Sequence, residues 1–447
     1  MKKTKRYIVS AAALVCLVAL CFSMTGCLSI GRTLYDLAND SRDQTSTQNY
    51  NNWFDDLVDG NDDEDGDPAS PASANIKIDN AGDGIEYASA KGVMSIVSVV
   101  ADFTVTSSFG GGFFGGRPTT QNQTAAGSGV IIKLDKEKGN ALIMTNYHVV
   151  YEAGSDTDNG ISDKIRVYLY GSESYLTDEN DSMAIEATYI GGSMNYDLAL
   201  LSVENSSIIK KSFVQAVNFA DSDQIHVGQT AIAIGNPGAE GISVTKGIIS
   251  KESETIVMSA VDNVSTLSIR VIRIDAAVNS GNSGGGLFDT SGNLIGIVNA
   301  KSIETNVDNI GYAIPSNVVR AIADNIIYYC SDGSNKQVMR ALIGITIVPA
   351  YSYATYDEST GLVDIIEDVQ VYSITSGSLS DGVLKEGDIV KSVTLNGKTI
   401  DITRTYHLVD LMLEARVGDS VIINIERNGT PMQFTMNLTE DCLTAVQ

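Results

Sequence analysis

The stretch "DAAVNSGNSGGGLF" (residues 275–288) places Ser283 among asparagines and glycines, directly before an apolar Leu-Phe pair. Such a cluster is most often a plain turn between two strands. It does not fit a phosphate-binding loop, because that motif needs a Lys after its glycines and none follows here. The third interpretation is a nucleophile loop built on Ser283, which requires a base and a carboxylate elsewhere in the chain.

The chain contains three histidines, which limits the search for that base. His226 lies in a polar turn, and His407 begins a predicted helix far along the chain. His148 comes just after the apolar run "ALIMT" (141–145), and Asp197 begins the apolar run "DLALLSV". Taken singly, these two are more often a structural histidine and a turn residue.

Jointly the three residues favour another interpretation. The order His148, Asp197, Ser283, with each residue on its own strand-like segment, is that of chymotrypsin-type serine proteases. In such a triad His148 takes the proton of the weakly nucleophilic Ser283 hydroxyl, and Asp197 orients the imidazole. The backbone N–H groups of Gly281 and Ser283 form the predicted oxyanion hole, where a glycine leaves space for the substrate.

The same blocks carry a family resemblance. "TNYHVV", "YDLALL" and "DAAVNSGNSGGGLF" resemble, in this order, the three catalytic blocks of HtrA/Deg-type serine proteases, and "IAIGNP", "TKGIIS", "GIVNA" and "IGYAIP" resemble their connecting segments. The likeness extends from about Ile85 to the C-terminus. Ser280 and Gly286 stand where family members usually have proline, which affects the stiffness of the loop more than its chemistry.

The chain divides into a β-rich part and a smaller second part. Short runs rich in Val, Ile and Tyr recur between residues 85 and 314, which predicts an antiparallel barrel or sandwich, and residues 315–330 predict a closing helix. The resemblance implies a mainly β fold with two six-stranded antiparallel β-barrels of chymotrypsin type, then an α+β PDZ domain. The expected division is a signal peptide at 1–26, an acidic disordered tether at 27–84, the protease domain at 85–335 and the PDZ domain at 336–441.

The PDZ resemblance rests on "LIGI", "LKEGDIV", "LNGK" and "VGDSVIINIERNG". It implies that a hydrophobic C-terminal peptide adds to the sheet as a strand, while backbone N–H groups bind its carboxylate. The residues expected to do so are Leu342, Ile343, Gly344 and Ile345. The alternative is that "LIGITIV" (342–348) is only a buried strand. The Gly/Phe-rich loop 107–124 aligns with the family's regulatory flap.

The N-terminus predicts export. It has a basic start and an apolar run from Ile8 to Phe22, which is short for a membrane-spanning helix. "MTGC" (24–27) resembles a bacterial lipobox, in which Cys27 is lipidated; because Met24 is an unusual residue there, an uncleaved signal anchor is the alternative. Both place the rest of the chain at the outer face of the bacterial cytoplasmic membrane. The acidic segment 55–84 predicts a solvated spacer.

Composition excludes several classes of partner. A net charge of −25 argues against nucleic acid, which requires clustered Lys and Arg. Outside the N-terminal signal the sequence has two cysteines, Cys330 and Cys442. They form either a disulfide or two buried thiols. No His/Cys cluster predicts a metal, and no cofactor is expected.

The resemblance implies an ATP-independent serine endopeptidase that degrades misfolded or unfolded proteins as a homotrimer. Ala277 stands roughly where trypsin-like enzymes carry an acidic pocket residue, so an uncharged pocket that favours apolar side chains is expected. One alternative is a surface chaperone or peptide-sensing scaffold that keeps the fold only for binding. Another is a dedicated processing protease for one secreted partner.

Overall fold

The computed structural model describes residues 84–107, 119–157, 159–172, 181–237, 240–262, 264–300, 310–330 and 337–446. All of them belong to one compact unit, Ala69–Gln447. The expected signal peptide, Cys27, nearly all of the tether and the central part of the flap lie outside the described residues. Within the described ranges, no helix has the length and apolarity that crossing a membrane requires.

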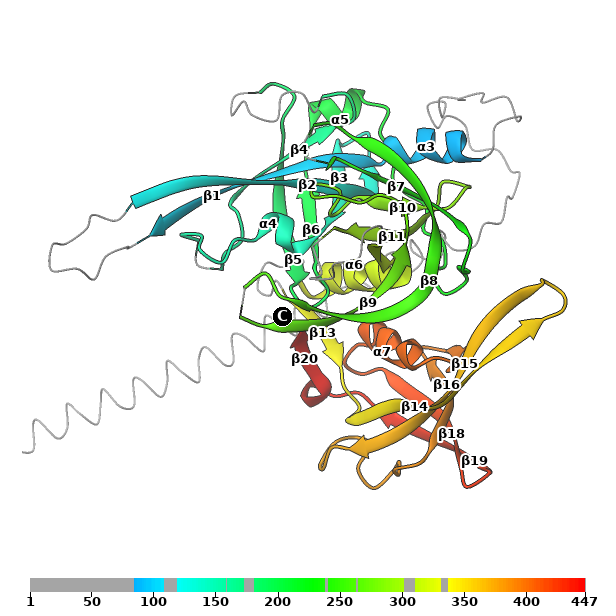
Figure 1. Ribbon diagram of the computed structural model, residues 1–447. Helices are drawn as coiled ribbons and strands as arrows, with labels where there is room; N and C mark the ends of the chain where they lie inside the picture. Colours follow the sequence, from blue (N-terminus) through cyan, green and yellow to red (C-terminus); the bar gives the residue numbers. More distant parts are fainter. Residues whose placement is uncertain are drawn as a thin grey trace, which may run out of the picture. The chain divides into compact units, whose positions relative to one another are not determined.

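The first barrel closes in the order β1-β2-β3-β6-β5-β4 (Figure 1). Its strands are β1 (Ile96–Ser107), β2 (Thr119–Asp135), β3 (Asn140–Thr145), β4 (Lys164–Leu169), β5 (Ile185–Ser193) and β6 (Leu198–Val203). Side chains alternate between the two faces of a strand, so Val97, Val99 and Ala101 of β1 enter the same buried apolar cluster. Helix α3 (Ile85–Val93) precedes the barrel, and the short helices α4 (Tyr147–Val150) and α5 (Ser207–Lys211) lie in its connections.

The second barrel closes in the order β10-β11-β12-β9-β8-β7. Its strands are β7 (Thr230–Gly235), β8 (Ser243–Ser259), β9 (Thr266–Ile274), β10 (Gly286–Phe288), β11 (Leu294–Asn299) and β12 (Gly311–Pro315). Helix α6 (Ser316–Cys330) follows and buries Val319, Ile322 and Ile326 in the main core, as its apolar spacing predicts. The two antiparallel barrels confirm the predicted mainly β, chymotrypsin-like fold.

The C-terminal part is a mixed unit around its own apolar core. Its sheet has the order β14-β15-β16-β18-β19, with β17 paired to β16. The elements are β13 (Val338–Ala341), β14 (Ile345–Asp357), β15 (Leu362–Ile374), β16 (Ile389–Leu395), β17 (Lys398–Asp401), α7 (Thr405–Glu414), β18 (Ser420–Arg427), β19 (Thr430–Asn437), the 3-10 turn η3 (Glu440–Cys442) and β20 (Leu443–Val446). Strand β20 pairs with β13 in a separate two-stranded sheet.

A buried cationic contact joins α7 to the second barrel. The guanidinium of Arg270, on β9, forms ion pairs with Asp410 of α7 and with Asp223, the latter at 2.7 Å. The same group stacks on the Tyr406 ring at 3.4 Å from its centroid. Burial raises the pKa of the Asp410 carboxyl to about 6, although the neighbouring Arg270 acts to lower it; the nearby Asp223 carboxylate adds a smaller rise.

Candidate active site

His148 and Asp197 lie in direct contact at the edge of the first barrel. His148 is in α4, just after β3, and Asp197 immediately precedes β6, which pairs with β3. The Asp197 carboxylate accepts bonds from His148 Nδ1 at 2.7 Å and from the His148 backbone N–H at 3.0 Å. Since an ionised carboxylate only accepts, Nδ1 carries the proton and Nε2 keeps its lone pair for use as a base.

Two asparagines complete the surroundings of Asp197, which is only 2% exposed. Asn299 Nδ2 donates to Asp197 Oδ2 at 3.0 Å, and Asn146 Nδ2 donates to the Asp197 carbonyl oxygen at 2.7 Å. Asp197 has a backbone φ of +49°, in the left-handed region that residues other than glycine rarely adopt. The two asparagine contacts hold Asp197 in this conformation. Asp197 is thus buried and oriented by several donors, as a carboxylate that holds a histidine in place must be.

Ser283 lies close to this pair. The backbone N–H of Ala300, the residue after Asn299, donates to Ser283 Oγ at 3.1 Å. The end of β11 therefore contacts both residues. The Asn299 side chain bonds to Asp197, and the backbone N–H of Ala300 bonds to Ser283. Among the described residues no hydrogen bond joins Ser283 to His148 directly; in free enzymes such bonds are often long and tighten when substrate binds.

The nucleophile loop, residues 279–286, turns through two glycines with positive φ, Gly281 at +97° and Gly284 at +83°. The N–H of Asn282 donates within the turn to Asn279 O at 3.0 Å. The N–H groups of Gly281 and Ser283 donate to no other group in the part of the chain that the structure describes. They are the two donors that the sequence predicts for an oxyanion hole.

Ser128 of β2 fixes the nucleophile loop from the opposite barrel. Its N–H donates to Ser283 O at 2.8 Å, and its Oγ donates to Gly281 O at 2.8 Å. The same Oγ accepts from the Asn236 N–H at 2.8 Å. The sequence predicts Ser128 only as the first residue of a strand, and it gives Asn299 no role. Both contacts form only when the two barrels pack together, so no local pattern predicts them.

Close packing requires a glycine beside Ser283. A Cβ at Gly284 would lie 2.1 Å from Ser128 O and 2.5 Å from Thr145 Oγ1. No side chain fits there without moving the two barrels apart, and its φ is also unfavourable for other residues. Of the run of glycines in this loop, Gly284 is therefore the one that lets β2 approach the nucleophile.

Tyr147, the residue before His148, packs against Tyr189 of β5. The Tyr147 and Tyr189 ring centroids are 6.4 Å apart in an edge-on arrangement. Burial raises the pKa of the Tyr147 phenol to about 12, and burial also raises the pKa of Tyr189. Both phenols therefore stay neutral at physiological pH and add no charge beside His148 and Asp197.

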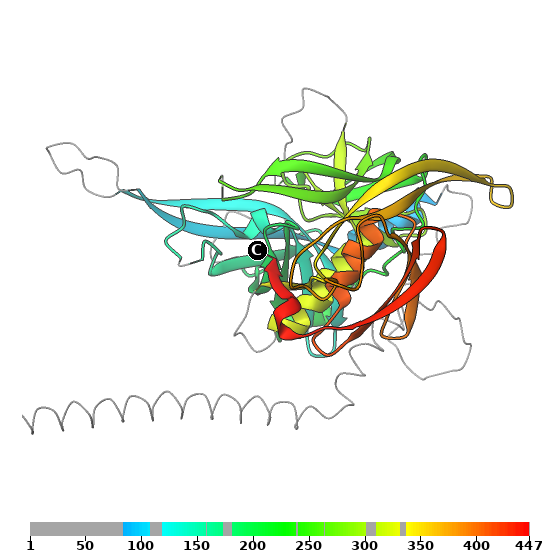
Figure 2. The same cartoon turned by 90° about the horizontal axis from the view of Figure 1, so that it is seen from below.

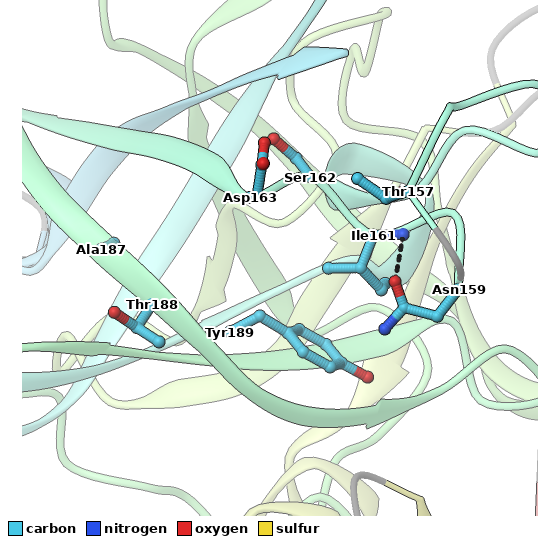
Figure 3. A pocket seen from close by; sticks show the side chains of 8 residues that line it. All are labelled: Thr157, Asn159, Ile161, Ser162, Asp163, Ala187, Thr188 and Tyr189. Atoms are coloured by element: carbon cyan, nitrogen blue, oxygen red, sulfur yellow. Dashed lines mark hydrogen bonds between the residues drawn. The ribbon is translucent and has the colours of Figure 1, made fainter. Parts of the chain in front are cut away.

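A cavity of about 330 Å³ opens on the first barrel beside Tyr189 (Figure 3). Its lining comes from β5 and from the segment before β4, and consists of Thr157, Asn159, Ile161, Ser162, Asp163, Ala187, Thr188 and Tyr189. None of the three residues of the predicted triad lines it. The cavity is therefore separate from the three residues that the sequence predicts to be catalytic.

The second predicted site, at residues 342–345, is a loop followed by a strand and not one continuous strand. Strand β14 begins only at Ile345, and Gly344 has a φ of +82°. The N–H of Leu342 donates to Cys442 O at 2.7 Å. The N–H groups of Ile343 and Gly344 donate to nothing within the described ranges.

The structure also describes the two cysteines outside the N-terminal signal and the grouping of possible metal ligands. Cys330 and Cys442 are both buried and are not joined in a disulfide, so the disulfide alternative is wrong. No group of three or more His, Cys, Asp or Glu side chains suited to a metal occurs among the described residues.

Comparisons with known proteins show what this chain is similar to in sequence. Residues 127–297 match the family described as "Trypsin-like peptidase domain". "Serine protease Do-like HtrA" of Bacillus subtilis (strain 168) is 35% identical over 325 residues, which cover 71% of this chain and 64% of that protein. "Serine protease Do-like HtrA" of Lactococcus lactis subsp. lactis (strain IL1403) is 30% identical over 353 residues, which cover 75% of this chain and 77% of that protein.

A solved structure, "HtrA-type protease AlgW with decapeptide", is 25% identical, with 79% of this chain and 98% of that chain covered at a TM-score of 0.48. The family assignment rests on the sequence relatives. The matched region spans less than two thirds of the length of the Bacillus protein. By the extent of its sequence identity with the Lactococcus protein, the chain belongs to the Do-like HtrA family of serine proteases.

Proposed function

We propose that the protein is an ATP-independent serine endopeptidase that cuts misfolded or unfolded proteins, with His148, Asp197 and Ser283 as its catalytic residues. The observation that carries this proposal is the 2.7 Å contact between Asp197 Oδ2 and His148 Nδ1, which leaves Nε2 as the basic nitrogen. The free N–H groups of Gly281 and Ser283 support it, because they lie in the same loop as the nucleophile.

In the first half of the reaction, His148 Nε2 takes the proton of Ser283 Oγ while Oγ forms a bond to the substrate carbonyl carbon. The carbonyl oxygen becomes an oxyanion, which the N–H groups of Gly281 and Ser283 stabilise; each such donor is worth about 10²–10³ in turnover. His148 then gives its proton to the leaving amine, and an acyl-enzyme remains. Water, deprotonated by His148, releases the acyl group in the second half.

Residues 336 onward form, in this proposal, a PDZ domain that binds hydrophobic C-terminal peptides. The free N–H groups of Ile343 and Gly344 would bind the terminal carboxylate, and the peptide would add to β14 as a strand. Strand β14 supports this because it is an edge strand of its sheet. Residues 85–335 are the protease domain, and the family resemblance favours a homotrimer.

We also propose that the enzyme acts at the outer face of the bacterial cytoplasmic membrane, held there by a lipid on Cys27. A relative, the "Periplasmic pH-dependent serine endoprotease DegQ" of Escherichia coli (strain K12), is 31% identical and outside the cytoplasm by its name. Intact-mass analysis of the membrane-extracted protein tests the anchor. A chain that begins at lipid-modified Cys27 supports it, and an unmodified chain beginning at Met1 indicates a signal anchor instead.

The central experiment compares wild type with Ser283→Ala on an unfolded casein-like substrate, with and without a hydrophobic C-terminal peptide. Loss of cleavage in the variant supports the protease. Equal behaviour of the two proteins would favour the alternative, a surface chaperone or peptide-sensing scaffold. A protein that cuts one secreted partner but no unfolded substrate would be the dedicated processing protease.

A further inference from the structure

Strands β14 and β15 form a hairpin that is longer than its sheet. Strand β16 pairs with β15 only at Val369 and Gln370, whereas the β14–β15 pairing continues to Asp357 and Leu362. A break in register between Pro349 and Tyr351 separates the two halves. We call the outer half, residues 351–366, the arm; Figures 1 and 2 show it projecting beyond the other strands of its sheet.

The arm exposes apolar side chains on both of its faces. Tyr356 pairs with Val363 across the hairpin, and these side chains are 64% and 60% exposed. Tyr351 and Tyr353 alternate with this pair and therefore lie on the opposite face, with ring centroids 5.6 Å apart. Two-stranded hairpins are marginally stable in water, and exposed apolar clusters mark interaction sites.

The charge of the hairpin selects among partners. The arm contains no Lys, Arg or His and three acidic residues, Asp357, Glu358 and Asp364. Glu367 and Asp368, just beyond the arm, already pair with Arg404 and Lys391. Two copies of the arm would bring like charges together, which opposes self-association. A partner that combines basic and apolar residues would satisfy both the carboxylates and the tyrosines, and aromatic faces also attract cations.

The arm continues the strand edge to which a substrate C-terminus is proposed to add. If the peptide's C-terminal carboxylate binds at Ile343 and Gly344, the peptide pairs antiparallel to β14. Its upstream residues then run along β14 toward Asp357. At about 3.3 Å per residue, roughly six residues of peptide reach from Ile345 to Tyr351. Residues further upstream in the peptide would then lie against the arm.

We propose that the arm binds the segment upstream of the substrate's C-terminus and selects chains in which basic and apolar residues alternate there. This inference rests on the proposed peptide-binding role of residues 343–345. It adds a substrate class: polypeptides with an exposed apolar C-terminus preceded by a cationic, amphipathic stretch.

The test uses the full chain with Ser283→Ala, so that peptides bind without being cut, and fluorescence anisotropy at low and high salt. Three labelled peptides share the same four apolar C-terminal residues: the tetrapeptide alone, a sixteen-residue peptide with alternating Lys and Leu upstream, and one with alternating Glu and Ser. The Lys/Leu peptide should bind at least tenfold more tightly than the other two, with the advantage reduced by salt.

Adding Tyr351→Ser, Tyr353→Ser and Tyr356→Ser should remove that advantage and leave tetrapeptide affinity unchanged. Tyr170→Ser, an equally exposed tyrosine on the first barrel, is the matched control and should change nothing. Asp364→Lys should weaken binding of the Lys/Leu peptide and strengthen binding of the Glu/Ser peptide.

The outcomes separate the inference from the function on which it rests. If the tetrapeptide binds and the three peptides have equal affinities, the arm has no such role. If the tetrapeptide does not bind at all, the proposed peptide site is wrong. If the tyrosine changes alter the oligomeric state in sedimentation but no peptide affinity, the arm contacts a second copy and the inference is overturned.

Discussion

Two glycine loops of this chain present free backbone N–H groups in different ways. The nucleophile loop, 279–286, offers those of Gly281 and Ser283, and the loop before β14 offers those of Ile343 and Gly344. The first loop is fixed by Ser128, which belongs to the other barrel. The second is fixed within its own domain, where Ser380 Oγ donates to Ile343 O at 2.7 Å.

The difference implies that the proposed reaction and the proposed peptide binding would depend on separate supports. Bonds across the barrel interface place the nucleophile, so changes in either barrel should affect turnover. The second loop needs only the C-terminal core, so changes there should affect peptide binding and leave the cleavage of small substrates intact. Variants of each loop can test this separation.

The largest effect is expected for Ser283→Ala, because it removes the nucleophile. Turnover should fall by about 10⁴-fold or more, with folding and tetrapeptide binding unchanged. Cleavage of a fluorogenic peptide and anisotropy with the tetrapeptide measure the two properties. Ser280→Ala, an exposed residue of the same loop, is the control and should retain activity; a Ser283→Ala variant that still cuts at the wild-type rate would refute the triad.

Ser128→Ala should reduce kcat by about tenfold to a hundredfold with KM nearly unchanged, since a misplaced nucleophile loop affects the transition state most. The variant also leaves the Gly281 carbonyl without its donor, at a cost of about 1–3 kcal/mol in stability. Ser162→Ala removes a comparable bond, to Asp102 O at 2.7 Å, away from the loop. Equal losses of kcat in the two variants would mean that Ser128 acts only through overall stability.

Gly344→Ala should weaken tetrapeptide binding at least tenfold without changing the cleavage of a small substrate. The new Cβ would lie 2.1 Å from Ser378 Cβ, and φ at Gly344 is already +82°. Gly377→Ala is the matched control, because Gly377 has a φ of +78° and no atom within 4 Å of its Cβ position. If both variants bind the tetrapeptide as wild type does, the carboxylate site lies elsewhere.

The smallest effect concerns the contact of α7 with the second barrel. The folded-state pKa of Asp410, about 6, is above its ordinary value of 3.8, so its contribution to stability is fully present below pH 3.8 and is lost as pH rises through 6. The shift corresponds to a loss on the order of 2–3 kcal/mol. The Asp410→Asn variant cannot ionise at this position and so does not lose this stability. The melting temperature of the variant minus that of wild type should therefore rise by a few degrees between pH 4 and pH 7. A constant difference would show that Asp410 does not titrate there.

Much of the fold followed from local patterns in the sequence. Runs such as "ALIMT" (141–145) and the helix at 315–330 agree with β3 and α6 within a residue. Strand β8 was missed because its residues 250–255 are polar and its pairing with β9 contains irregularities, so it shows no clear alternation. Strand β10 was not predicted, because three residues are too few to show a period.

The candidate site was predictable only in part for a related reason. His148, Asp197 and Ser283 have side chains whose chemistry is recognisable in the sequence. Ser128 and Asn299 are common polar residues that matter only through what they contact, at sequence separations of 153 and 102 residues. The bonded N–H of Leu342 likewise depends on Cys442, far along the chain, and no local pattern could reveal it.

The bonds from Ser128 to the nucleophile loop also determine when the chain can first act during its synthesis. A nascent chain that has completed β6 already contains the base and its carboxylate, but Ser283 and Asn299 belong to the second barrel. Its nucleophile is fixed only after that barrel has folded against Ser128. In the proposed mechanism, an unfinished chain that lacks the second barrel therefore lacks the nucleophile and the Asn299 contact to Asp197, and could not yet cut itself or its neighbours.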